Sequence, residues 1–381
     1  MCMYRTTIEE LCLKVTSGGT PSRRNPDFYT GEIPWIKTGE LKGWYINDSS
    51  ERITSEAISS SSAKIYPKNT VLMAMYGDGG TIGSTAITSI EAASNQASCA
   101  MIPNQEKCHP LYLLFLLQMQ REAIVALALG GAQRNLNQGT IKNFEVTVHD
   151  LKSQYEIARV LSSYNNLIEN NNRRIAILED MAQSLYREWF VKFRYPGHEN
   201  QTLIDSALGP IPDGWEVEDF SDFIDFWNGK KNSKSESGEY PLYGANGVIG
   251  QSDGWKYENA VIIGRVGAYC GAVEYCFDKF WGSDNTIIAK CKSQDSIAYL
   301  FLLLETFNLN NYAGGAAQPL LTQATLKRLQ FALPPAVLIK EFEEIAYTLF
   351  ESVVNLKKRN KNLKDQRNML LPKLISGNIK I

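Results

Sequence analysis

Long apolar runs are missing from this sequence of 381 residues, and so is an apolar segment at its start. The two most apolar stretches, 111–117 and 299–304, are about a third of the roughly 20 residues that a membrane-spanning helix needs. The opening residues, Met-Cys-Met-Tyr-Arg-Thr-Thr-Ile-Glu-Glu, contain no apolar signal region. We therefore expect a cytoplasmic protein without a membrane partner.

Cysteine and histidine are too few and too scattered to predict a metal site or a disulfide framework. The seven cysteines, at positions 2, 12, 99, 108, 270, 276 and 291, form no Cys-x-x-Cys pair, and the three histidines lie far apart in sequence. An odd number of cysteines without a secretion signal is typical of reduced thiols. We expect neither a bound metal nor a cofactor in this chain.

An excess of positive charge is also missing. The net charge is −2, divided as −1 over 1–150, +2 over 151–198, −7 over 199–335 and +4 over 336–381. Binding to nucleic acid requires clustered lysine and arginine. The acidic segment 199–335 would have to gather its basic residues on one face, or a partner would have to supply most phosphate contacts. We expect both, and weak binding to DNA by the chain alone.

Motifs of nucleotide-using enzymes are absent as well. There is no Walker A motif and no Asn/Asp-Pro-Pro-Tyr/Phe motif, and Gly77, Gly79 and Gly83 miss the dinucleotide fingerprint by one position. Pro26-Asp27 followed by Glu40-Leu-Lys42 matches a loose pattern of metal-dependent nucleases. Chance matches to so permissive a pattern are common, so we expect no catalysis by this chain.

What the sequence does contain is an internal repeat with an offset of 185 residues. The run 133–141, Gln-Arg-Asn-Leu-Asn-Gln-Gly-Thr-Ile, is echoed by 318–326, Gln-Pro-Leu-Leu-Thr-Gln-Ala-Thr-Leu. Upstream of these runs, 239–247 corresponds to 32–39, 261–271 corresponds to the glycine-rich loop 76–83, and 283–286 corresponds to 94–97. We call these two globular segments the heads. They diverge in sequence, which is expected if they bind different targets.

A long helix is predicted after each globular segment, with apolar residues spaced alternately four and three apart. The first series runs from Ile157 to Trp189 and the second from Phe342 to Leu374, at the same offset. This spacing predicts two helices packed along each other, and the connection through the second head makes the pair antiparallel. The expected interface residues are Ile157, Leu161, Ile168, Ile175, Leu178, Leu185, Phe342, Leu349, Val353, Leu356, Leu363 and Leu370.

Polar residues interrupt this seam at Asn171, Asn360 and Arg367, where they can fix the register of the two helices. Pro372 is expected to kink the second helix or end it early. The first seam is roughly 48 Å long at about 1.5 Å per residue. On duplex DNA this length sets an upper bound of roughly 14 base pairs between the centres of the two heads. A pseudo-twofold molecule suits such a target.

The chain resembles the specificity subunits of Type I restriction–modification systems over essentially its whole length. The resemblance rests on the repeat and on six segments: 18–22 (Gly-Gly-Thr-Pro-Ser), 33–39, 131–136, 153–158, 208–215 and the closing 373–381. The usual Glu-Gln at the start of the long helix is replaced by Ser153-Gln154 and, in the second copy, by Lys340-Glu341.

The resemblance implies a division of labour between this chain and its partners. Each globular segment would be a target-recognition domain for one half of a bipartite sequence in double-stranded DNA. The helices would space these domains and dock two methyltransferase subunits. Partner subunits would bind S-adenosylmethionine, and ATP with Mg²⁺; whether restriction subunits also bind stays open.

We therefore predict an α+β fold with two globular target-recognition domains of pseudo-twofold symmetry, separated and joined by a long antiparallel two-helix coiled coil. The first domain covers 1–150 and the second covers 199–335. The central helix and its linker cover 151–198, and the distal helix covers 336–381.

Base contacts are expected from polar and basic residues in the loops of each domain. Arginine can bond guanine through two hydrogen bonds, asparagine can do the same to adenine, and aromatic rings can stack on bases. The alternative for Tyr76 and Tyr243 is packing at the edge of the core. The predicted contacts are Lys37, Thr38, Tyr76, Asp78 and Arg134 in the first domain, and Tyr243, Asn246, Arg265 and Tyr269 in the second.

Two other functions compete with DNA recognition. The first is an adaptor or structural protein that binds protein partners through its long helices, which the acidic second domain favours slightly. The second is a single-chain nuclease or methylase, which the missing motifs disfavour.

Overall fold

The computed structural model describes residues 3–77, 80–128, 135–293, 296–315 and 319–379. The chain divides into two compact units. Unit 1 comprises residues 1–171 and 359–381, and unit 2 comprises residues 172–358. Both units combine helices with mostly antiparallel sheets, which confirms the predicted α+β class.

Unit 1 contains a five-stranded sheet, a three-stranded sheet and a two-stranded ribbon. Their strand orders are β2-β9-β6-β7-β4, β5-β3-β8 and β1-β10. The strands are β1 (Met3–Thr7), β2 (Cys12–Ser17), β3 (Ile33–Ile36), β4 (Tyr45–Ile46), β5 (Arg52–Ile53), β6 (Val71–Ala74), β7 (Thr85–Thr88), β8 (Ala93–Ser94), β9 (Ser98–Pro103) and β10 (Glu145–His149).

Unit 2 repeats this plan. Its four-stranded sheet has the order β14-β20-β17-β18, its three-stranded sheet β16-β15-β19, and its ribbons pair β13 with β21 and β11 with β12. The strands are β11 (Leu203–Ile204), β12 (Ile211–Pro212), β13 (Glu216–Asp219), β14 (Ile224–Asn228), β15 (Tyr240–Gly244), β16 (Gly247–Ser252), β17 (Ala260–Gly264), β18 (Val273–Cys276), β19 (Trp281–Gly282), β20 (Thr286–Cys291) and β21 (Gln330–Leu333).

The small sheets show the repeat most directly. In each, the middle strand pairs antiparallel with one neighbour and parallel with the other. The parallel pairing joins Ile36 to Ser94 in unit 1 and Tyr243 to Gly282 in unit 2. The sequence repeat is therefore also a repeat of strand order and strand direction.

Two helices are much longer than the others, α5 with 36 residues and α9 with 40. The α-helices are α1 (Ser55–Ser59), α2 (Pro110–Met119), α3 (Arg121–Ala126), α4 (Gln138–Lys142), α5 (Leu151–Tyr186), α6 (Phe220–Phe223), α7 (Ile297–Thr306), α8 (Gln323–Lys327) and α9 (Ala336–Ile375). The short 3-10 helices are η1 (Pro26–Tyr29), η2 (Thr38–Glu40), η4 (His198–Asn200), η5 (Gly267–Tyr269) and η6 (Leu309–Tyr312), and η3 (Arg187–Val191) is a π-helical turn at the end of α5. Among the helices that the structure describes, none combines the length and apolar character of a membrane span.

Each unit builds its core around one apolar helix, α2 in unit 1 and α7 in unit 2. Residues Leu113 to Leu117 of α2 and most of α7 are buried, because both helices are apolar on all sides. The long helices add side chains to these cores: Ile157 and Leu374 in unit 1, and Phe342 in unit 2.

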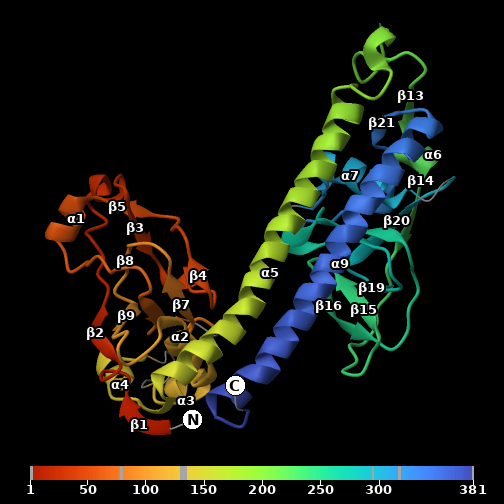
Figure 1. Cartoon of the computed structure of the whole chain (residues 1–381). Helices are drawn as coiled ribbons and strands as arrows, with labels where there is room; N and C mark the ends of the chain where they lie inside the picture. Colours follow the sequence, from red (N-terminus) through yellow and green to blue (C-terminus); the bar gives the residue numbers. More distant parts are fainter. Residues whose placement is uncertain (1–2, 78–79, 129–134, 294–295, 316–318, 380–381) are drawn as a thin grey trace. The chain divides into compact units, whose positions relative to one another are not determined.

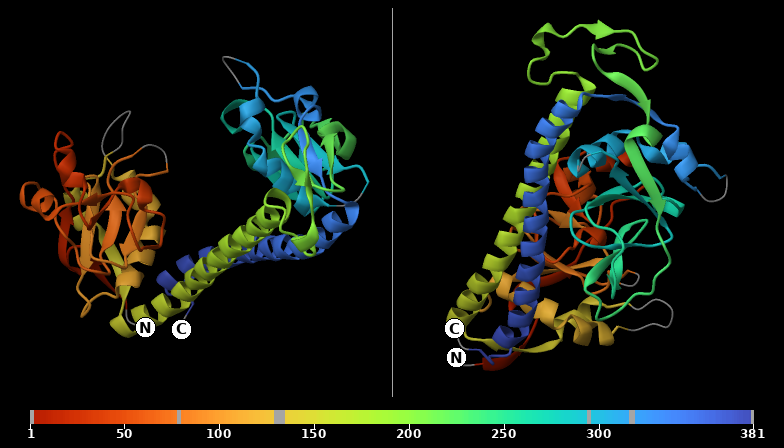
Figure 2. Two further views of the ribbon diagram at one scale, coloured as in Figure 1. Left: turned by 90° about the horizontal axis from the view of Figure 1, so that it is seen from above. Right: turned by 90° about the vertical axis from the view of Figure 1, so that its right-hand side faces the viewer.

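In each unit the segments of α5 and α9 lie side by side (Figures 1 and 2). In unit 1, Asn171 Nδ2 donates to Asn360 Oδ1 (2.8 Å), and Arg367 donates to Asn165. In unit 2, Lys357 Nζ forms an ion pair with Glu179 Oε1 (2.9 Å). Partner numbers on α9 fall as those on α5 rise, so the helices are antiparallel, as predicted.

The predicted interface residues of the long helices divide into two groups. Between the helices, Ile175, Val353 and Leu356 form a buried cluster with Leu178, while Ile168 is buried and Leu363 is half-buried. The residues nearer the heads pack into the two main cores instead: Ile157, Leu161 and Leu370 in unit 1, and Leu185, Phe342 and Leu349 in unit 2.

Two features of the helix ends follow from single residues. Helices α2 and α3 follow each other directly and are separated only at Gln120. Contrary to the expectation of an early end, helix α9 continues past Pro372 to Ile375. The proline lies in the last turn, so a kink there would redirect only the three helical residues that follow it. Asp150 caps α5, since its Oδ1 accepts from Ser153 N–H (3.0 Å).

Candidate nucleic-acid interface

Several loops of unit 1 meet on residues 94–98 and are joined there by main-chain hydrogen bonds. They are the loop after β2, the end of β3, the loop after β6 and the first copy of the repeated run. The bonds are Gly18 N–H to Ser98 O (3.1 Å), Asn95 N–H to Ile36 O (3.0 Å), Met75 N–H to Ala97 O (2.8 Å) and Leu136 N–H to Met75 O (2.9 Å). We call this group of loops the loop face of unit 1.

Unit 2 has the same loop face, built on residues 282–286. Its bonds are Gly229 N–H to Thr286 O (2.9 Å), Ser283 N–H to Tyr243 O (2.9 Å), Arg265 N–H to Asn285 O (3.0 Å) and Leu321 N–H to Arg265 O (2.9 Å). Gly18 and Gly229 are equivalent in this frame, and both must be glycine. A Cβ would lie 2.1 Å from Asn95 O at the first position and 1.9 Å from Ser283 O at the second.

These bonds also correct the alignment of the two heads. The sequence aligned Ser283 with Ser94, whereas the hydrogen bonds place Ser283 opposite Asn95 and Gly282 opposite Ser94. The error is one residue. It arose because two short polar runs that both begin with serine were matched by composition, while the register is determined by main-chain bonds.

The two copies of the repeated run are similar because a glutamine in each copy bonds to the same strand. Gln138 Nε2 donates to Val15 O on β2 (2.7 Å), and Gln323 donates to Phe226 O on β14 (3.0 Å) in the amide orientation that satisfies both of its neighbours. Val15 and Phe226 are equivalent, each three residues before the glycine of the loop face. The two glutamines therefore fix the same strand in both units.

Three predicted contacts of unit 1 lie in described parts of its loop face. Tyr76 is 40% exposed, and Thr38, half-buried, opens η2. Lys37 Nζ bonds to Glu51 Oε1 (2.7 Å), so this lysine already has a carboxylate partner. Asp78 and Arg134, also predicted as contacts, lie outside the described residues.

A second cation shares the carboxylate of Glu51. Arg23 Nη2 lies 2.7 Å from Glu51 Oε2, and its guanidinium lies over the rings of Tyr29 (4.0 Å) and Trp35 (5.0 Å). The hydrogen bond from Lys37 and the charge of Arg23 hold the pKa of the Glu51 carboxyl below its ordinary value. One carboxylate therefore faces two cations, which leaves this cluster with one positive charge in excess.

The structure brings three predicted contacts of unit 2 together. A Cβ on Gly264 would lie 2.4 Å from Tyr269 O and 2.6 Å from Ala245 O, so the β15–β16 turn, Arg265 and Tyr269 lie against one another. Asn246 is exposed in that turn, Tyr269 is 51% exposed, and Arg265 is half-buried.

Tyr243 is the exception among the predicted contacts. It is 9% exposed and packs against Phe280, with ring centroids 5.4 Å apart. Burial raises the pKa of its hydroxyl above the ordinary value. The alternative weighed for this residue, packing in the core, is what the structure shows, and we remove Tyr243 from the candidate base contacts.

The loop faces and the long helices recur in a known family. The family profile described as the Type I restriction modification DNA specificity domain matches residues 5–180 and 212–365. The two matched segments cover both heads and most of both long helices. The chain belongs to this family.

Curated relatives of this specificity subunit carry the same description. The chain is 26% identical to the Type I restriction enzyme MjaIX specificity subunit of Methanocaldococcus jannaschii, over 97% of this chain and 91% of that protein. It is 23% identical to the EcoprrI specificity subunit of Escherichia coli, over 88% of this chain and 86% of that protein.

A solved structure supports the fold. The crystal structure of the Type I restriction–modification system S subunit from M. genitalium matches 98% of this chain and 96% of its own, with a TM-score of 0.68 and 18% sequence identity. At this identity the similarity supports the fold of the specificity subunit and not its target.

The nuclease-like motif of the specificity subunit is used for structure. Glu40 Oε2 accepts from Lys37 N–H (2.7 Å), and Glu40 Oε1 accepts from Ser50 N–H (2.8 Å), so this carboxylate closes the loop around η2. Within the described ranges, no group of three or more His, Cys, Asp or Glu side chains could hold a metal ion. The Asp27–Glu40–Lys42 pattern therefore gains no support as a catalytic site.

Sequence reasoning missed several cations near the loop faces. Besides Arg23, these are Lys230 and Lys234 in the β14–β15 loop. The available signal was the dense lysine run 230–234 within the otherwise acidic segment 199–335.

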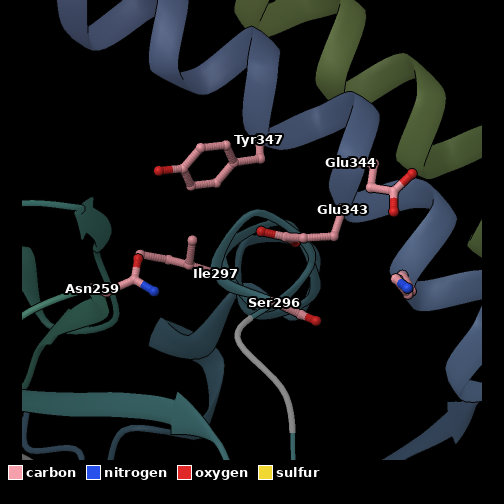
Figure 3. A pocket seen from close by; sticks show the side chains of 7 residues that line it. Asn259, Ser296, Ile297, Glu343, Glu344 and Tyr347 are labelled. Atoms are coloured by element: carbon pink, nitrogen blue, oxygen red, sulfur yellow. The ribbon is translucent and has the colours of Figure 1, made fainter.

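A hollow of about 550 Å³ in unit 2 lies away from the loop face, between α9 and the start of α7 (Figure 3). Glu343 extends from α9 toward the start of α7 and accepts from Ala298 N–H (3.1 Å) and Tyr299 N–H (2.9 Å). The carboxylate thus satisfies the amides that could bind an anion at that helix end. We assign this hollow to the attachment of α7 to α9.

Proposed function

We propose that this specificity subunit reads a bipartite DNA sequence, one half with the loop face of each head. Family membership supports DNA recognition in general. The division into two half-targets is supported by one observation: both loop faces have the same hydrogen-bonded frame but carry different side chains. At equivalent frame positions, unit 1 has Met75 and unit 2 has Arg265.

Two loop faces that share a main-chain frame but carry different side chains are suited to reading different bases in the same geometry. Contacts to base edges distinguish sequences, whereas the main-chain frame fixes only where those contacts are made. The candidate base contacts are Lys37, Thr38 and Tyr76 in unit 1, and Asn246, Arg265 and Tyr269 in unit 2. Asp78 and Arg134 remain candidates from the sequence alone.

The long helices would set the spacing of the heads and dock two methyltransferase subunits. Exposed apolar side chains on these helices support a docking role, among them Ile177 (59% exposed) and Met181 (50%) on α5 and Met369 (60%) on α9. The chain itself would carry no catalysis. S-adenosylmethionine, and ATP with Mg²⁺, would bind to partner subunits, and whether restriction subunits are among these partners stays open.

The test is a methylation map. The chain is expressed with its methyltransferase subunit in a host without adenine methylation, and modified adenines are located by long-read sequencing. We expect a split motif with a fixed gap. Exchanging residues 1–150 for the corresponding segment of a relative should change one half of the motif and leave the other half and the gap unchanged.

Two outcomes would contradict the proposal. A complex that forms but methylates no fixed motif would favour the alternative function, an adaptor that binds protein partners through its helices. A motif that changes in both halves after the exchange would refute the division of the target between the heads.

A further inference from the structure

One cation occupies the same place in both heads, although the loops that carry it differ in sequence. Arg23 lies five residues after Gly18, and Lys234 lies five residues after Gly229. Gly18 and Gly229 are equivalent in the two loop faces, and so are the next residues, because Gly19 N–H donates to Ser94 O and Lys230 N–H to Gly282 O, both at 2.9 Å.

The small sheets confirm that Arg23 and Lys234 are equivalent. Arg23 bonds to Glu51, which immediately precedes β5 and whose main-chain carbonyl accepts from Trp35 N–H (2.9 Å). Lys234 packs over Gly250, the residue opposite Leu242 on the strand that neighbours β15: a Cβ on Gly250 would lie 3.2 Å from its side chain. Pro34 and Pro241 precede Trp35 and Leu242, so Glu51 and Gly250 match as well.

In both heads a tryptophan side chain donates a hydrogen bond to the loop that carries the cation, but the two tryptophans come from different strands. Trp35 Nε1 on β3 donates to Gly19 O (3.0 Å), and Trp281 Nε1 on β19 donates to Lys230 O (2.7 Å). Two tryptophans on non-equivalent strands thus hold the same carbonyl. The position of the loop is maintained in both heads while its sequence is not.

A residue that reads bases should differ between two heads with different targets, whereas a residue that binds the uniform backbone should be matched. We propose that Arg23 and Lys234 are matched phosphate anchors, one in each head, that bind the DNA backbone. This proposal rests on the proposed function and adds the contacts that orient each head.

The heads differ in how the anchor is held before DNA binds. Arg23 is paired with Glu51, and a phosphate would have to compete with that carboxylate. Lys234 has Gly250 in the place of Glu51, and no ion pair is formed by Lys234 within the described part of unit 2. The second head, which is acidic overall, therefore presents its anchor without a competing carboxylate.

The experiment measures binding of the complex with its methyltransferase subunits to two duplexes, one with the mapped target and one with a scrambled sequence of equal length. Arg23→Gln and Lys234→Gln are each expected to weaken binding to both duplexes about three- to tenfold at low salt. The slope of log affinity against log salt should become shallower by about one per lost contact. The methylation motif should stay unchanged.

Matched controls and exchanges separate anchors from general charge effects. Lys107→Gln and Lys292→Gln remove exposed lysines beyond the far ends of β9 and β20 and should leave affinity and slope unchanged. Glu51→Gln should strengthen binding to the scrambled duplex a few-fold, because it frees Arg23 and Lys37. Gly250→Glu should weaken it, because it supplies Lys234 with the missing carboxylate.

The failures are distinguishable. A wild-type complex that binds neither duplex would refute the proposed function and the anchors together. If the wild-type complex binds DNA and neither Arg23→Gln nor Lys234→Gln changes its affinity, the anchors alone are refuted. A changed half-motif in either variant would also refute them, since that residue would then read bases.

Discussion

At the scale of single residues, Arg265 is the candidate base contact whose main chain is most completely fixed. Its N–H donates to Asn285 O (3.0 Å), and its carbonyl accepts from Leu321 N–H (2.9 Å) and from Cys270 Sγ (3.3 Å). The buried Nε of its guanidinium has no hydrogen-bond partner in the described residues. A fixed main chain with an unsatisfied donor suits a side chain that completes its bonds on a ligand.

We predict that Arg265→Ala relaxes one half of the methylated motif. Loss of a two-bond contact to guanine should reduce discrimination at one position by about 1–3 kcal/mol. Arg265→Lys should not restore it, because lysine retains the charge but lacks the planar fork. Methylation mapping of both variants checks the prediction, and an unchanged motif would remove Arg265 from the candidate contacts.

The limits of sequence reasoning at this scale have physical causes. Tyr243 looks like a loop residue because it precedes Gly244, but Leu242, Tyr243 and Gly244 are all buried, since β15 is the middle strand of its sheet. Lys37 is paired with Glu51, a contact across fourteen positions that no local pattern reveals. The turns were predictable from glycine, whereas side-chain partners were not.

At the scale of elements, the antiparallel pairing of α5 with α9 depends on a small apolar cluster. Ile175, Val353 and Leu356 are at most 8% exposed and touch few other buried residues. The hydrogen bond from Asn171 to Asn360 adds a polar layer that other registers would leave unsatisfied. A charge in this cluster would have no partner.

We predict that Ile175→Asp destabilises the helix pair by on the order of 3 kcal/mol, because it buries an unpaired carboxylate. Ile177→Asp is the matched control, two residues along the same helix and 59% exposed, and it should cost little. Chemical denaturation of both variants measures the difference. Equal stabilities would contradict the assignment of Ile175 to the interface.

The heptad pattern predicted this pairing because apolar residues spaced alternately three and four positions apart form one stripe along a helix, and two such stripes pack against each other. It could not show where the seam merges with the heads, since an apolar residue has the same spacing in both environments. Ile157 and Phe342 fit the seam pattern but belong to the two main cores. Only the tertiary structure separates the two roles.

At the scale of the whole molecule, unit 1 is assembled from two distant parts of the chain. Leu374 and Ile375 of α9 are buried in its main core, together with Ile157 and Leu161 of α5. The ring Nε2 of the buried His149 lies 3.0 Å from Leu374 O and 3.1 Å from Ile375 O. Unit 2 consists of one continuous stretch.

We predict that Leu374→Ala destabilises unit 1 by about 2–5 kcal/mol, as expected for a buried leucine, and leaves unit 2 unchanged. Met369→Ala, on the same helix and 60% exposed, should have little effect. Hydrogen exchange resolves the two units, and protection should fall in 1–171 and persist in 172–358. Equal loss of protection in both units would show that they unfold as one.

The repeat in the sequence predicted two similar heads. It did not predict that unit 1 takes in the end of α9, because a contact closed across the 187 residues of 172–358 leaves no local trace in the sequence. This discontinuity has a consequence for synthesis on the ribosome. All residues of unit 2 emerge before the last part of unit 1, so the head made first is the head finished last. Until Leu374 and Ile375 emerge, the nascent first head exposes the apolar surface that they will cover, and this interval is when it most needs protection from aggregation.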